Sequence, residues 1–146
     1  MPQAKTYPNR LGLKGWLGGG RWGFERYLFT LHRITGLGLV LYFLMHIVVT
    51  TSRALGQTWW DRTMGAVSGP IFLVGEYLVF VAFAFHAANG IRLGLIELGI
   101  LTGKAEEPVY PYRSSLNVQR PFMIILMVIV AVVVLVGGYD FFFMAH

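Results

Sequence analysis

The 146-residue chain has no cysteine, and this absence removes several classes of site at once. Disulfide frameworks, thiolate zinc sites, iron–sulfur ligation and cysteine nucleophiles are all excluded. A bound metal would need histidine, carboxylate or methionine ligands, and the four histidines are His32, His46, His86 and His146. Charge is also scarce, because only 13% of the residues are Asp, Glu, Lys or Arg. This is about half the usual share of a globular protein, which excludes a disordered or highly solvated chain.

Long uncharged runs make up much of the sequence, of which 55% is hydrophobic. Positions 34–52 and 121–139 form two such runs, each with 19 uncharged residues. A third run, at 71–91, contains one charged residue, Glu76. A helix of about 20 apolar residues crosses a bilayer. The sequence therefore predicts an all-α membrane protein with three transmembrane helices, at about 28–51, 71–98 and 121–144.

Lysine and arginine are distributed unevenly around these runs. Residues 1–33 carry six of them and residues 92–120 carry four, whereas residues 52–70 carry two. Because cytoplasmic segments carry the excess of positive residues, we expect the N-terminus and the second loop in the cytoplasm. The net charge of +5 is then a topological signal, with no nucleic acid as partner. We expect an interfacial segment at 1–27 and one membrane domain at 28–146, with soluble-side chemistry supplied by other subunits.

His86 is the clearest candidate for a ligand, because ionisable residues inside a span are costly and usually functional. Ala82, His86, Gly90 and Gly94 are spaced four apart, so they lie in one row on a helix. A flat porphyrin needs such a row, with one nitrogen ligand and little bulk around it. Nε2 would bind iron while Nδ1–H donates to the Ala82 carbonyl. The alternative is a row of small residues that only packs helices, with a histidine that bonds a neighbour.

His32 and Arg33 open the first predicted span at its cytoplasmic edge. Together they offer hydrogen-bond donors and a fixed positive charge at the level of the lipid headgroups. Such groups can meet haem propionates or a quinone carbonyl. The alternative is an ordinary interfacial anchor, in which the arginine reaches lipid phosphates.

His46 lies at a different depth from His86. It is thirteen residues inward of Arg33, and His86 is six residues inward of Arg92, if both arginines mark one interface. At 1.5 Å per residue, the two histidines differ in depth by about 11 Å, too far for one haem iron. We therefore predict that His46 binds a second haem, with a histidine from a partner. The alternative is a structural hydrogen bond, and His146 is expected to be a frayed terminus.

Two motifs resemble those of a known family. His32-Arg33-Ile34-Thr35-Gly36 resembles the H-R-x-[ST]-G motif of the cytochrome b membrane anchor of succinate dehydrogenase, complex II. His86-Ala87-Ala88-Asn89-Gly90-Ile91-Arg92 resembles the second motif of that family, H-x-x-x-G-I-R. The motifs occur in the expected order on the first and second spans, and the resemblance covers the region from Thr30 to Arg92.

The resemblance implies roles for these residues. His86 would be an axial ligand of haem b, with the second ligand from the sister membrane anchor of the complex. His32 and Arg33 would face the haem propionates and the quinone pocket, below the iron–sulfur subunit that receives electrons from the flavoprotein. The same resemblance implies cofactor-binding positions close by, at Thr30, Gly90 and Arg92. The quinone would be menaquinone or ubiquinone, and the membrane a bacterial or archaeal plasma membrane.

The chain also departs from better-known members of this family. Phe29 stands where they carry a quinone-site serine, Leu93 stands where they carry a further histidine, and the N-terminal R-P-x-S-P-H segment is absent. His46 is extra and is similar to a feature of members that carry two haems. Two other functions stay open, namely a haem-free structural anchor and the b-type anchor of another oxidoreductase, such as a fumarate reductase, hydrogenase or formate dehydrogenase.

Overall fold

A computed structural model describes residues 23–103, 110 and 114–144, and these residues are almost entirely helical. Three of the helices are long and apolar enough to cross a membrane, which confirms the three predicted spans. The elements in chain order are α2 (Phe24–Thr51), η2 (Ser52–Leu55), α3 (Gln57–Ala66), α4 (Pro70–Glu97), α5 (Leu116–Tyr139) and the π-helical turn η3 (Asp140–Met144). Most of the predicted segment 1–27, and His146, lie outside the described residues.

The first and third membrane spans, α2 and α5, begin earlier than predicted. The uncharged runs predict starts at about 28 and 121, whereas α2 begins at Phe24 and α5 at Leu116. The added turns contain the charged residues Glu25 and Arg120, which end the apolar runs without ending the helices. A helix can continue past the edge of the hydrocarbon because its backbone hydrogen bonds are internal.

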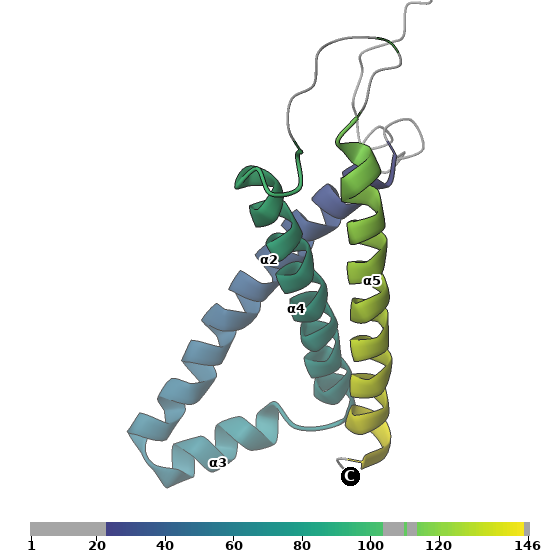
Figure 1. Ribbon diagram of the computed structural model, residues 1–146. Coiled ribbons are helices and arrows are strands. Elements are labelled where there is room, and N and C mark those ends of the chain that lie inside the picture. The colour runs from purple at the N-terminus through teal and green to yellow at the C-terminus, as the bar shows by residue number, and fades with distance from the viewer. Residues whose placement is uncertain (1–22, 104–109, 111–113, 145–146) are drawn as a thin grey trace, which may run out of the picture.

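The ten-residue helix α3 is not predicted by the uncharged runs. Gly56 and Gly69 flank the segment that contains it, with φ of 110° and 114°. Only glycine adopts such backbone angles readily, so these two residues allow the chain to turn sharply on either side. In Figure 1, α3 lies across the end of the molecule and joins the far end of α2 to the region where α4 starts. We refer to this end as the α3 end.

The three long helices are arranged as a crossed pair, α2 and α4, and an antiparallel pair, α4 and α5. α2 crosses α4 near the start of α2 and diverges from it toward the α3 end, whereas α4 and α5 lie alongside each other (Figure 1). Two glycines permit the close approach of α5. A Cβ atom on Gly137 would overlap the ring of Phe80, and one on Gly138 would lie 2.8 Å from Oη of Tyr77. Tyr77 then donates a hydrogen bond to the carbonyl of Val134 over 3.0 Å.

The described chain buries very little of its own apolar surface. Only Leu101 and Met123 are buried hydrophobic residues in this part of the chain, and α2 has no buried residue. The remaining buried side chains are polar, namely Ser52, Asn89 and Arg92. Outward-facing apolar side chains are what a helix needs against lipid or against other membrane helices.

Candidate functional site

The crossing of α2 and α4 is built from two histidines and two glycines. A Cβ atom on Gly36 would lie 2.7 Å from Cε1 of His86, and one on Gly90 would lie 3.5 Å from Cε1 of His32. Each histidine is followed by a glycine four residues later, so His32 and Gly36 share a face of α2, and His86 and Gly90 share a face of α4. Each imidazole therefore fits over the glycine of the other helix.

The two imidazole rings stack face to face at this crossing. Their centroids are 3.9 Å apart and their planes differ by 7°. A metal bound to an imidazole lies in the plane of the ring, along the nitrogen lone pair. Because the two planes are parallel and separate, the rings cannot hold one iron from opposite sides. If His86 held an iron, any further protein ligand would therefore have to be a residue other than His32.

The Nδ1 atom of His86 has two polar neighbours on α2. It lies 3.0 Å from the carbonyl oxygen of His32 and 3.3 Å from Oγ1 of Thr35. The Thr35 hydroxyl lies 2.8 Å from the Leu31 carbonyl, to which it can donate its only proton. A carbonyl can only accept, so the contact with His32 requires Nδ1–H and leaves the Nε2 lone pair available. This is the tautomer that a metal ligand needs.

The prediction that Ala82 accepts this hydrogen bond is wrong. The acceptor is the backbone of α2, which comes within reach because Gly36 has no side chain to hold it away. The periodicity of a single helix favours Ala82 as the acceptor because Ala82 lies one turn before His86. This periodicity contains no information about a neighbouring helix. The described residues contain no group of three or more His, Asp or Glu that could hold a metal ion, so a ligand role for His86 concerns a cofactor that brings its other ligands.

Arg92 and Asn89 form a buried polar pair beside the stacked rings. Arg92 is only 4% exposed, and its Nε donates to Oδ1 of Asn89 over 3.0 Å. Asn89 is fully buried, and neither its Nδ2 nor Nδ1 of His32 has a hydrogen-bond partner among the described residues. Buried polar atoms are normally paired, so this cluster has capacity to bind one more polar group. Sequence reasoning gives Asn89 no role, because it occupies a variable position of the second motif.

Thr30 and Arg33 are placed differently from this cluster. Arg33 is exposed, and its guanidinium lies 5.3 Å from the centre of the Phe29 ring. Consecutive residues on a helix point about 100° apart, so His32 can face α4 while Arg33 faces outward. Thr30 is half-buried. The structure thus brings together His32, His86, Gly90 and Arg92, with Arg33 on the outer surface of α2.

His46 lines a groove of about 450 Å³ at the α3 end, between α2, α3 and α4. Its ring is tilted against Tyr42, with centroids 5.7 Å apart. A second groove, of about 710 Å³, lies beside His86 and Gly36. The two grooves share Tyr42, Glu76 and Val79, so they form one opening, which we call the wedge. The wedge has His86 near the crossing of the helices and His46 near α3.

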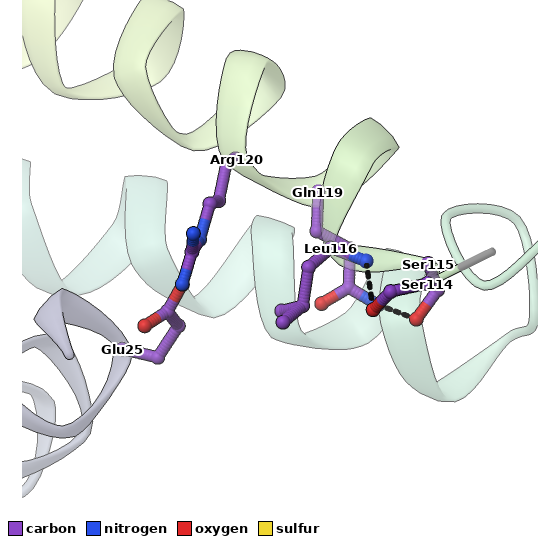
Figure 2. A network of polar contacts seen from close by, with 6 residues as sticks. All are labelled: Glu25, Ser114, Ser115, Leu116, Gln119 and Arg120. Atoms are coloured by element: carbon purple, nitrogen blue, oxygen red, sulfur yellow. Dashed lines mark hydrogen bonds and ion pairs between the residues drawn. The ribbon is translucent and has the colours of Figure 1, made fainter. Parts of the chain in front are cut away.

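An ion pair joins α2 to α5 at the end opposite α3. Nε of Arg120 lies 2.8 Å from Oε1 of Glu25, and Figure 2 shows the two side chains meeting from the two helices. The same view shows serines at the start of α5, where Oγ of Ser114 accepts from the Leu116 backbone and Oγ of Ser115 accepts from Gln119. The ion pair joins the start of α5 to the start of α2, whereas the serine contacts are local to α5.

Comparison with known proteins gives two matches. The profile of the succinate dehydrogenase/fumarate reductase transmembrane subunit family matches residues 13–136. The chain is 28% identical, over 111 residues, to the succinate dehydrogenase 2 membrane subunit SdhC of Mycobacterium tuberculosis. That alignment covers 76% of this chain and 77% of the mycobacterial one. No solved structure matches the chain.

Proposed function

Since the chain belongs to the transmembrane subunits of succinate dehydrogenase and fumarate reductase, we propose that it is the haem b-carrying anchor of a succinate:quinone oxidoreductase. In this role it carries electrons from the iron–sulfur subunit to membrane quinone. The observation that carries the proposal is the hydrogen bond from Nδ1 of His86 to the His32 carbonyl, since it leaves Nε2 of a mid-membrane histidine available for iron. A haem b at this position would accept and release single electrons.

We assign the second axial ligand to the sister anchor of the complex. The stacking of His32 on His86 supports this assignment, because it leaves no second histidine of the crossing able to face the same iron. The wedge beside His86 offers an apolar surface for the porphyrin, with Gly36 at its edge. His86 is held on one side by α2, so the chain fixes the orientation of the ring before the cofactor arrives.

The polar cluster next to the crossing is proposed to bind haem propionates or a quinone oxygen. Arg92 supplies a positive charge, and Nδ1 of His32, which is also buried, has no hydrogen-bond partner among the described residues. A Cβ atom on Gly90 would lie 3.5 Å from Cε1 of His32, which is an ordinary van der Waals contact. Arg33 and Thr30 are proposed to act at the rim, where Arg33 is available to a quinone or to the iron–sulfur subunit. Arginine keeps its proton in proteins, so Arg33 can polarise a carbonyl but cannot serve as a base.

The proposed topology places this cluster on the cytoplasmic side of a plasma membrane. The excess of Lys and Arg in residues 1–33 and 92–120 supports it. The iron–sulfur subunit and the flavoprotein would dock on that side. In this proposal the dicarboxylate binds to other subunits, so the anchor is compatible with either direction of the reaction, succinate oxidation or fumarate reduction.

His46 is proposed to bind a second haem b near the opposite membrane surface. It lines a groove large enough for part of a porphyrin, and its side chain has no hydrogen bond among the described residues. Two haems at different depths would form an electron path toward a quinone on the outer side. An electron moving through the membrane potential exchanges about 2.3 kcal/mol per 100 mV.

The test of the proposed function uses the complex purified through a tag on this chain. A flavoprotein and an iron–sulfur protein should copurify, and a reduced-minus-oxidised spectrum should show a b-type haem. In His86→Ala the low-spin spectrum should be lost or strongly changed, while succinate oxidation by a soluble dye continues. An unchanged spectrum and haem content in the variant would remove His86 as a ligand.

A further inference from the structure

Glu76 is an acidic residue inside a membrane span, and nothing assigned so far uses it. It lies six residues from the start of α4, about 9 Å along the helix axis. It lines both grooves of the wedge, and its side chain has no hydrogen bond or ion pair among the described residues. Acidic residues at such depths are costly and normally meet a polar or charged group. Acyl chains alone would leave it without one.

We propose that the wedge is filled by a transmembrane helix of a partner subunit, which presents a lysine or arginine side chain to Glu76. The proposal rests on the proposed function for the identity of the partner, which is the second anchor of the complex. It adds the surface that this second anchor occupies and the chemistry by which the surface is recognised. The ligation of haem would bring the second anchor close to His86, but it gives Glu76 no role.

The dimensions of the wedge fit a helix. Along α2 the lining residues run from Gly36 to Thr50, which is about 21 Å at 1.5 Å per residue. This is most of the thickness of a hydrocarbon core, about 30 Å. The occupant must therefore be long in the direction of the spans. A transmembrane helix has that shape. Haems at His86 and His46 would occupy only the two ends of the wedge, which leaves the wall at Tyr42, Glu76 and Val79 between them for the helix.

The lining of the wedge also fits a helix with one basic residue. Most of the lining side chains are aliphatic or aromatic, and α2 buries none of its residues within this chain. The polar side chains that both grooves share are Tyr42, which has a hydroxyl group, and Glu76, which has a carboxylate. Only Glu76 thus offers a negative charge at this level. Of the three residues that line both grooves, Tyr42, Glu76 and Val79, only Glu76 would form an ion pair with a basic residue on an otherwise apolar helix.

The first test measures how much second anchor remains with the tagged chain after solubilisation. In Glu76→Lys, two like charges would face each other, and we expect a loss of about tenfold or more, since breaking a buried ion pair is strongly destabilising. Glu76→Gln should show a smaller loss. The control is Asp61→Lys, which makes the same charge change at an exposed residue of α3 outside the wedge. Equal retention in Glu76→Lys and in the control would overturn the proposal.

The second test identifies the opposing residue. Converting one Lys or Arg within the spans of the second anchor to Glu should restore its retention by Glu76→Lys. A second anchor with no Lys or Arg within its spans would overturn the proposal directly. The absence of cysteine allows a further check, in which Val79→Cys forms a disulfide with one helical face of a cysteine-scanned second anchor, whereas Leu135→Cys, 73% exposed on α5, does not. The reverse pattern would overturn the proposal.

The two proposals fail in different ways. Haem content of the unaltered complex tests the proposed function, and it does not depend on what faces Glu76. Retention of the second anchor tests the wedge, and it is measured without reference to haem. A complex with haem but with full retention in Glu76→Lys would overturn only the docking proposal.

Discussion

Replacing Gly36 with alanine adds one methyl group at a position where His86 leaves no room for it. The new Cβ would lie 2.7 Å from Cε1 of His86, whereas ordinary van der Waals contacts begin at 3.4 Å. The two helices would have to separate by about 0.7 Å, the difference between these distances. Overpacking of this kind costs about 1–3 kcal/mol.

The separation also acts on the hydrogen bond that orients His86. If the shift falls along that bond, the distance from Nδ1 to the His32 carbonyl grows from 3.0 Å to about 3.7 Å, beyond the range of a hydrogen bond. Its loss costs about another 0.5–1.5 kcal/mol. Each 1.4 kcal/mol is a factor of about ten in an equilibrium, so we expect haem occupancy at limiting haem to fall by about tenfold or more.

A matched control lies two residues away on the same helix. A Cβ atom on Gly38 would have no atom within 4 Å, so Gly38→Ala makes the same chemical change without a clash. Both variants are purified as the complex, and haem per flavin is measured by the pyridine haemochrome assay. Gly36→Ala should lose haem and Gly38→Ala should retain it. Equal haem content in the two variants would refute the reasoning, because the crossing would then not control the ligand.

Three further outcomes follow from the described contacts. Tyr77→Phe removes the hydrogen bond to the Val134 carbonyl and should lower the thermal stability of the complex by about 1 kcal/mol, measured by a melting curve. Arg120→Ala removes the ion pair with Glu25, but Arg120 is 55% exposed, so its effect on the same curve should be at most about 1 kcal/mol. In His46→Ala, haem per flavin should fall from two to one, and a ratio of one in the unaltered complex would contradict the second haem.

The three spans are predictable because an apolar run of membrane length with at most one charged residue is typical of a helix in lipid. Helix α3 is not predictable in this way, because its sequence, QTWWDRTMGA, mixes polar and apolar residues over only ten positions. A short helix of this kind shows no uncharged run, and its limits depend on the backbone freedom of Gly56 and Gly69. The paired residues Trp59 and Trp60 indicate an interfacial position without indicating a helix.

The site is predictable in its residues but not in its contacts. The spacing of small residues around His86 and the two motifs point to the histidines that the structure brings together. They favour Ala82 as the acceptor for Nδ1 of His86 because it lies one turn away on the same helix. The sequence of that helix does not show that the backbone of α2 comes closer. The signal that corrects this is the repeated four-residue spacing of His and Gly in both motifs, which suits two helices that cross in opposite directions. In the sequence, Glu76 stands out only as an interruption of an apolar run.

The close crossing of α2 and α4 lies near the start of α2, so a small change in the crossing angle would displace the far end of α2 by a larger distance. From Gly36 to Thr50 the lever arm is about 21 Å, and a rotation of about 5° at the crossing moves the far end by about 2 Å. His86 lies closely over Gly36 at the crossing, whereas the far end of α2 leads into α3, which is flanked by Gly56 and Gly69 with positive φ. We therefore expect the width of the wedge at the α3 end to depend more on what fills it than the surroundings of His86 do.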